Sequence, residues 1–359
     1  MNVHESVHIH SILASRLALP ANRRPTIKDV ASRAGVSYQT VSRTINGKGE
    51  VLPETRRRVE EAMRELGYRP NAIARSMVAG RTHMLGCISP NLTDYTFACL
   101  IEGAKAEAHR RGFLLLSVTA LTEGEVPTLC DDLVHSGWVD GLLVINPYAD
   151  GRHRFFRDII ARGTPVVYLG ADPRDEPVSC VHNDDEGGAY CAVNHLVKLG
   201  HRAIAMITGP LREDCAADRV AGYRRALAEA GLEPSPGLIV EGDWTAPAGY
   251  RAMQALLAGG QPFTALFAQN DRMAIGAMRA AREHGRQIPG DLAVVGFDDI
   301  PFASYCDPAL TTVHNDVLEH GRQAARILIE TIDDPGRLPE RVVIPAELVV
   351  RESCGAGRR

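Results

Sequence analysis

The feature that most constrains the fold is an alternation of short apolar runs with longer amphipathic segments between residues 84 and 297. Amphipathic segments occupy residues 97–111, 186–199, 217–230, 247–258 and 272–284. The apolar runs are MLGCIS, FLLLSV, GLLVI, PVVYLG, AIAMIT, LIVEG, ALFAQ and LAVVGF. Such alternation indicates βαβ units, in which parallel sheets carry helices on both faces. Eight strands over residues 83–352 predict an α/β domain of two doubly wound lobes rather than one sheet.

Polar residues follow several of these strands, where ligands bind in doubly wound folds. Asp243 and Trp244 follow LIVEG, Asn270 follows ALFAQ, and Asp298 follows LAVVGF, while Arg219 lies on the segment after AIAMIT. Carboxylate, amide and guanidinium groups pair with vicinal hydroxyls, and an aromatic ring covers the apolar side of a pyranose. Each side chain alone could cap a helix or fill the core. Together they predict an effector site that suits a sugar.

Charge divides the chain unevenly. Residues 23–82 carry thirteen Lys or Arg against six acids, a net charge of +7, and residues 1–22 balance. The net charge of the whole chain is −4, so residues 83–359 carry −11. A basic head on an acidic body is typical of a protein that binds nucleic acid with one end only.

Within the basic head, the segment TIKDVASRAGVSYQTVSRTING predicts two short helices joined by a tight turn. Thr26 with Asp29 resembles a capping box, Gly35 suits a left-handed helix end, and Ser37 caps the second helix. The second helix presents Tyr38, Gln39, Ser42 and Arg43 outward, as a recognition helix does in a major groove. A third helix is predicted from Pro53 to Leu66, ended by Gly67.

The segment NAIARSMVAGRTH after Pro70 is too short to be a stable helix by itself in water. Its Ala, Ile and Met content differs from the Gly and Ser of an ordinary flexible linker. This composition favours a structured hinge, and a plain linker is the alternative.

The runs TIKDVASRAGVSYQTVSRTINGKGEV and ETRRRVEEAMRELGYRPNAIARSM closely resemble the lactose-repressor (LacI/GalR) family of transcription regulators, and the similarity extends from Thr26 to about Glu352. The resemblance implies a homodimer that binds double-stranded operator DNA and a small-molecule effector. It also implies a periplasmic-binding-protein-like core and hinge helices that insert an apolar side chain, here Met77, into the minor groove.

Two groups of site residues follow from the motifs and this resemblance. The expected DNA-binding residues are Thr26, Ser37, Tyr38, Gln39, Thr40, Ser42, Arg43, Asn46, Asn71, Ala74 and Met77. The expected effector-binding residues are Phe97, Arg219, Trp244, Asn270, Asp298 and Asn315.

The sequence departs from the family in three places. Leu52 stands where a Ser or Thr usually caps the third helix, which costs about 1 kcal/mol of local helix stability. Met77 replaces the usual Leu. Gly170 stands where the family's lactose-responsive member has an acidic sugar contact, so the same galactoside is not assured as ligand.

The expected function is a repressor of carbohydrate-utilisation genes that a sugar, such as a galactoside, releases from its operator. The alternative is a co-repressor-type regulator that binds a purine or another non-sugar ligand. We expect a dimer because no apolar heptad repeat follows Glu352. The expected organisation is an N-terminal extension (1–24), a helix-turn-helix domain (25–70), a hinge (71–82), an effector domain (83–352) and a tail (353–359).

Other classes of protein fit less well. No Ser-His-Asp order, HExxH, Walker loop or GxGxxG is evident, so we expect no enzyme and no catalytic residues. Eight cysteines without a CxxC pair predict neither a metal site nor a disulfide framework, and we expect no cofactor. The first residues lack the basic start of a signal peptide, and no apolar run is long enough for a membrane span. We therefore expect a cytoplasmic protein with no membrane partner.

Overall fold

The computed structural model describes residues 25–46, 49–69, 80–120, 122–146, 153–173 and 176–358. The chain divides into two compact units, residues 1–82 and 83–359. No helix in the described ranges combines the length and apolar character that a membrane crossing requires.

Three helices are described in residues 25–46 and 49–69 of the first unit. They are α2 (Ile27–Ala34), α3 (Tyr38–Asn46) and α4 (Pro53–Leu66). The predicted capping box is present, since the amide of Asp29 donates to Thr26 Oγ1 and the amide of Thr26 donates to Asp29 Oδ2. Gly35 and Gly67 end their helices at φ values of 64° and 61°, a left-handed backbone that a side chain would strain.

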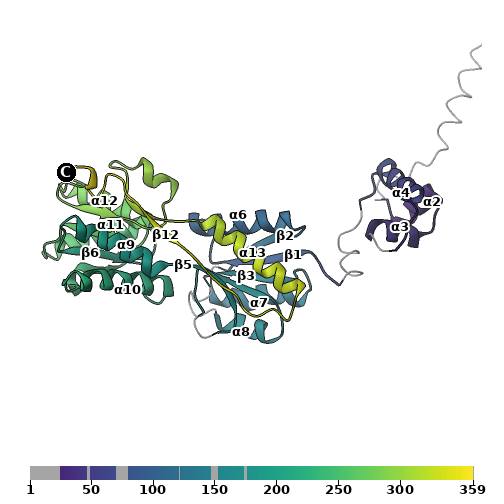
Figure 1. Ribbon diagram of the computed structural model, residues 1–359, viewed down its shortest axis with the longest axis horizontal. Coiled ribbons are helices and arrows are strands. Elements are labelled where there is room, and N and C mark those ends of the chain that lie inside the picture. The colour runs from purple at the N-terminus through teal and green to yellow at the C-terminus, as the bar shows by residue number, and fades with distance from the viewer. Residues whose placement is uncertain are drawn as a thin grey trace, which may run out of the picture. The chain divides into compact units, whose positions relative to one another are not determined.

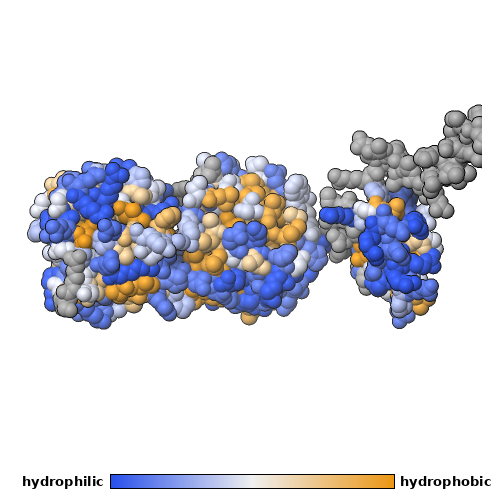
Figure 2. Space-filling model, turned by 90° about the horizontal axis from the view of Figure 1, so that it is seen from above, coloured by the Kyte–Doolittle hydropathy of each residue, from blue (hydrophilic) through white to orange (hydrophobic). Residues whose placement is uncertain are grey.

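A small core holds these helices together. Val30, Ala31 and Ala34 of α2 pack with Val41 of α3 and Val59 of α4. This is the apolar stripe that the sequence predicts, and it leaves the opposite face of the helices to solvent. Figure 2 shows that hydrophilic side chains dominate the visible face of this unit.

The second unit consists of two α/β lobes. The first lobe has a six-stranded sheet in the order β11-β5-β4-β3-β1-β2, and the second has a four-stranded sheet in the order β7-β6-β8-β9. The strand pairs of both sheets are parallel. Helices cover both faces of each sheet (Figure 1), and separate apolar clusters fill the spaces beneath them. The predicted doubly wound α/β architecture is confirmed.

The strands of this unit are β1 (Met84–Ser89), β2 (Leu114–Thr119), β3 (Gly141–Ile145), β4 (Val166–Leu169), β5 (Ser179–Asn183), β6 (Ile204–Thr208), β7 (Ile239–Glu241), β8 (Ala265–Ala268), β9 (Ala293–Val295), β10 (Thr312–Asn315), β11 (Arg341–Ile344) and β12 (Ala346–Val349). Its α-helices are α6 (Tyr95–Arg110), α7 (Val126–Cys130), α8 (His153–Ala161), α9 (Asp185–Lys198), α10 (Asp214–Glu229), α11 (Ala246–Ala258), α12 (Asp271–Glu283) and α13 (Val317–Asp333).

The chain passes between the lobes at three places. β5 belongs to the first lobe and leads into α9 of the second, β10 of the second leads into α13 of the first, and β11 of the first leads into β12 of the second. β10 and β12 pair antiparallel beside the crossovers. Figure 1 shows β5 and β12 at the junction of the two lobes. Three connections of this kind let the lobes tilt relative to one another without separating.

The predicted end of the effector domain at Glu352 is too early. Ser353 and Cys354 are buried, at 0% and 2% exposure. The Ser353 hydroxyl donates to the Val294 carbonyl and accepts from the Thr311 amide, which ties the chain to the second lobe. Cys354 belongs to the apolar cluster that contains Ala293 and Val295 of β9, so both residues are part of the folded domain rather than of a tail.

Candidate DNA-binding surface and effector cavity

The second helix of the head, α3, presents a polar face. Tyr38 is 54% exposed, Gln39 and Arg43 are exposed, and Ser42 is partly exposed, while Val41 on the other side is buried. An amide and a guanidinium can each make paired hydrogen bonds to base edges, so this face has the chemistry for reading a major groove.

Other predicted DNA-binding residues help to shape the helices. The hydroxyl of Ser37 accepts from the amide of Thr40, so Ser37 caps α3 as expected. The side-chain Nδ2 of Asn46 donates to Ser42 Oγ, and Thr26 caps α2. Asn71, Ala74 and Met77 lie outside the described residues, and their roles stay predictions.

Leu52 occupies the cap position of α4 without a side-chain hydrogen bond and is 75% exposed. The departure from the family therefore has the predicted local consequence, an uncapped helix start. The Arg58 guanidinium donates to the carbonyls of Ala34 and Gly35, which fixes α4 against the turn between α2 and α3.

A cavity of about 90 Å³ lies between the two lobes of the second unit. Both lobes line it. The first lobe contributes Asp94, Thr96, Phe97, Leu100, Ile145, Asn146, Leu169, Gly170, Asn183 and His320, and the second contributes Asp185, Glu213, Cys215, Arg219, Trp244, Asn270 and Asp298. Five of the six predicted effector residues are in this lining.

Arg219, on α10, is the central cation of the cavity. Its Nε donates to Asp185 Oδ1 at 2.8 Å, its Nη1 donates to the Gln269 carbonyl, and Asp298 Oδ1 lies 3.8 Å from Nη1. The guanidinium is also 3.7 Å from the centre of the Phe297 ring. With 6% exposure and these partners, Arg219 is held in one orientation at the base of the site.

Glu213 joins the two lobes beside Arg219. Its Oε2 accepts from Trp244 Nε1 at 3.0 Å and from Asn146 Nδ2 at 3.1 Å. Trp244 belongs to the second lobe and Asn146 to the first, so one carboxylate oxygen orients the indole ring and bridges the cleft. A second bridge is the ion pair of Asp94 with Arg272.

Asn270 holds the backbone of Trp244. Its Nδ2 donates to the Trp244 carbonyl at 3.0 Å, and its Oδ1 caps α12 by accepting from the Met273 amide at 2.8 Å. Both polar atoms of Asn270 thus have structural partners in addition to their place in the lining.

Three lining residues, Asn146, Trp244 and Asp298, have left-handed backbones with φ values of 50°, 69° and 107°. Such conformations are uncommon for residues other than glycine, and most of all for a bulky tryptophan. Strained backbones of this kind cluster at functional sites, where the surrounding structure maintains them.

Burial dominates the electrostatics of the cavity. It raises the pKa of Asp298 to about 7 against the opposing effect of Arg219, and it also raises the pKa of Asp185. Four acids (Asp94, Asp185, Glu213 and Asp298) face one lining cation, Arg219. Because Arg272 pairs with Asp94 and Asp298 is partly protonated near neutral pH, the lining carries little net charge, which suits a neutral polyhydroxyl ligand.

Three polar groups in the lining have no hydrogen-bond partner among the described residues. They are Asn146 Oδ1, Asn183 Oδ1 and His320 Nε2, all buried. Buried polar atoms in native proteins are hydrogen-bonded in the great majority of cases. A ligand with several hydroxyl groups would supply the missing partners.

Asn315 is the predicted effector residue that the lining does not include. It lies at the end of β10, at the crossover into α13, and is 3% exposed, with both side-chain polar atoms unpaired among the described residues. Gly170, the departure from an acidic contact, does line the cavity. Its φ of 71° favours glycine, so this position offers the cavity no carboxylate.

Several lining residues were missed by sequence reasoning. Asn146 directly follows the apolar run GLLVI and could have been found by the same rule as Asn270. Asn183 is the last residue of β5, whose sequence SCVHN lacks an apolar pattern, and Asp185 is the first residue of α9. Glu213 and His320 give no local signal, because only the fold brings α10 and α13 to the cleft.

Comparison with known proteins gives a consistent result over most of the chain. Residues 26–71 match the family described as bacterial regulatory proteins, lacI family, and residues 193–354 match the periplasmic binding protein-like domain. The HTH-type transcriptional regulator CelR of Thermobifida fusca is 38% identical over 338 residues, 92% of this chain and 98% of the relative. The HTH-type transcriptional repressor PurR of Escherichia fergusonii is 36% identical, over 92% of this chain and 97% of the relative.

Solved structures of the same kind are similar to the whole fold. A CelR–cellobiose complex matches with a TM-score of 0.71 and 36% identity, covering 92% of this chain and all of the other. The lac repressor dimer bound to operator and the anti-inducer ONPF matches with a TM-score of 0.85 and 30% identity, covering 92% and 99%.

Proposed function

Because this chain belongs to the LacI family of DNA-binding transcription regulators, we propose that it is a repressor of carbohydrate-utilisation genes released by a neutral sugar. The sugar binds in the cavity between the lobes, and the head binds a palindromic operator as part of a homodimer. Its place of action is the cytoplasm, where operator DNA lies, and the proposal includes no catalytic step.

The observation that carries the sugar assignment is the group formed by Trp244, Glu213 and Arg219. Glu213 holds the indole at a fixed angle, while Arg219 and Asp298 lie close by with the unpaired polar atoms of the lining. An aromatic face with hydrogen-bonding groups around it suits a pyranose. The CelR relative was solved with cellobiose, which supports a sugar, and Gly170 argues against an identical galactoside site.

Release from DNA requires that the sugar prefer one arrangement of the lobes, since equal affinity for both would shift nothing. The Glu213 bridge and the Asp94–Arg272 ion pair link the lobes at the cavity. A ligand that contacts Trp244 and Asn146 changes the strength of the hydrogen bonds that these residues make to Glu213. We propose that the resulting tilt disturbs the spacing of the two heads on the operator.

The alternative effector is a purine that acts as co-repressor. The 36% identity to the repressor PurR supports this alternative. A neutral purine is compatible with the acidic lining. It differs from a sugar in having a flat ring that carries N–H and carbonyl groups in place of several hydroxyl groups. The direction of control also differs, because a co-repressor raises operator affinity.

A fluorescence titration distinguishes the two ligands. The chain has two tryptophans, and Trp138 is 60% exposed. In a Trp138→Phe background, Trp244 is the remaining tryptophan and reports directly on the cavity. Cellobiose, other glucosides, galactosides, guanine and hypoxanthine are titrated into the full-length protein. A saturable change with a sugar and none with purines supports the proposal, and the reverse pattern replaces it with the co-repressor function.

A further inference from the structure

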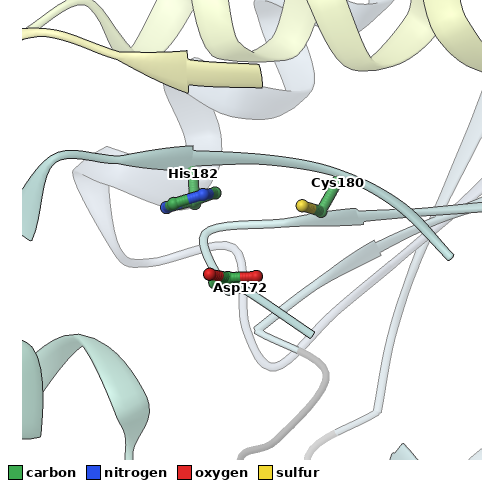
Figure 3. Close-up of side chains that lie close together, drawn as sticks. All are labelled: Asp172, Cys180 and His182. Carbon is green, nitrogen blue, oxygen red and sulfur yellow. The ribbon is translucent and has the colours of Figure 1, made fainter. Parts of the chain in front are cut away.

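Three side chains with metal-ligating atoms meet outside the lining of the effector cavity. They are Asp172, which follows β4, and Cys180 and His182, both on β5. A carboxylate oxygen, the sulfur and a ring nitrogen all lie within 4.8 Å of one another. Figure 3 shows the three side chains turned toward a common space.

The sheet explains why they meet. Cys180 and His182 are two residues apart on one strand, so their side chains project from the same face. β5 pairs in parallel with β4, and the chain beyond β4 returns past this face with Asp172. The cluster therefore rests on sheet geometry in addition to side-chain rotamers.

The neighbours of the cluster orient its members as the neighbours of metal ligands do. His182 Nδ1 lies 3.0 Å from the Asn183 carbonyl, which fixes a proton on Nδ1 and leaves Nε2 as the basic nitrogen. Arg341 Nη1 donates to Asp172 Oδ1 at 3.2 Å. Ligating histidines donate their second N–H to a carbonyl or carboxylate, and ligating carboxylates are themselves hydrogen-bonded.

The donor set selects a class of metal. A thiolate and an imidazole favour Zn²⁺ and its neighbours in the transition series over Mg²⁺ and Ca²⁺, which take oxygen ligands. A thiolate and a carboxylate supply two negative charges for a divalent ion, and Arg341, which pairs with Asp172, adds one positive charge beside them. The three ligand atoms lie within 4.8 Å of one another, and tetrahedral zinc would draw them together to roughly 3.5 Å.

We propose that Asp172, Cys180 and His182 form a binding site for a divalent transition metal of the zinc class, with a water molecule as fourth ligand. A Cys and a His two residues apart match no common zinc spacing, so the sequence alone does not predict this site. The site lies at the boundary of the lobes, since the Asp172 amide donates to Asp214 Oδ2 of α10 at 3.2 Å.

The test uses Co²⁺ as a spectroscopic substitute for zinc in the full-length protein. Because His4, His8 and His10 could also bind metal, all proteins carry the His4→Ala, His8→Ala and His10→Ala substitutions. We expect one equivalent of Co²⁺ to give tetrahedral absorption bands and a thiolate-to-cobalt charge-transfer band, both abolished by one equivalent of Zn²⁺. A large excess of Mg²⁺ is expected to leave them unchanged.

Variants assign the ligands. Cys180→Ser removes the charge-transfer band, and His182→Gln and Asp172→Asn weaken Co²⁺ binding at least tenfold. Cys191→Ser, at an exposed cysteine, serves as the matched control and keeps the full spectrum. Zinc raises the unfolding temperature of the control and not of the three ligand variants.

The proposal is overturned if no stoichiometric complex forms, if the band survives in Cys180→Ser, or if Cys191→Ser loses it. Should Cys180→Ser fail to fold, the variants of the partly exposed residues, His182→Gln and Asp172→Asn, provide the test. Unchanged Co²⁺ affinity in both of these variants refutes the site.

Discussion

Asp298 is predicted to reduce folding stability at neutral and alkaline pH, and Asp298→Asn tests this. Burial raises the pKa of Asp298 from 3.8 to about 7 in the folded protein. The folded state therefore holds its proton more tightly than the unfolded state does. The stability linked to this proton is complete below pH 3.8 and is lost as the pH rises toward 7.

The size of the effect follows from the same shift. A change of about three pKa units corresponds to about 4 kcal/mol, and about 2–3 kcal/mol of it develops between pH 5 and pH 8. Asparagine has the same shape, tolerates the same backbone and does not ionise. Arg219 keeps its 2.8 Å hydrogen bond to Asp185 in the variant. Asp298→Asn should therefore gain stability over wild type as the pH rises.

Urea unfolding of both proteins at pH 5, 6.5 and 8, followed by circular dichroism, measures the difference. Asp132→Asn, at an exposed acid outside the cavity lining, is the control and should follow wild type at each pH. The variant should also lose effector response, because a charge-assisted hydrogen bond is gone. A stability difference that stays constant with pH, or a variant as stable as wild type throughout, refutes the reasoning.

Three further predictions concern the head and hinge. Arg43→Ala should make the free energy of binding to the cognate operator less favourable by about 1–3 kcal/mol and weaken the base preference at one base pair per half-site. Competition anisotropy measures both effects. An equal loss of affinity for random DNA would instead make Arg43 a phosphate contact. Met77→Leu should hold or tighten operator affinity, and Met77→Gly should lower specific more than non-specific binding, whereas an unchanged ratio would indicate a plain linker. Leu52→Thr should stabilise the head by about 1 kcal/mol in thermal unfolding by capping α4, and no gain would show that the helix start needs no cap.

Local patterns in the sequence were sufficient to predict most strands and the helix ends of the head. All eight apolar runs became strands, because buried strands of a parallel sheet need continuous apolar sequence. The caps at Thr26 and Ser37 and the left-handed ends at Gly35 and Gly67 also followed from residue type. These features depend on a few adjacent residues, so one sequence suffices to find them.

The sequence did not reveal elements whose character depends on distant partners. β5 carries Ser, His and Asn, and β11 at the sheet edge begins with an exposed Arg341, so neither has an apolar pattern. For the same reason Glu213 escaped notice, although it bridges Trp244 and Asn146. The polar strand ends located the cavity, but the hydrogen bonds within it come from three-dimensional proximity.

The central claim, that a sugar in this cavity controls operator binding through Trp244, is tested most directly by anisotropy with labelled palindromic operator DNA. Wild type, Trp244→Ala and the control Trp138→Phe are each bound to the operator and titrated with the sugar that gives a fluorescence response. Wild type and Trp138→Phe should dissociate from the DNA, while Trp244→Ala should bind the operator normally and remain bound at every sugar concentration. Equal release of all three proteins, or tighter operator binding with a purine and no response to any sugar, would contradict the account.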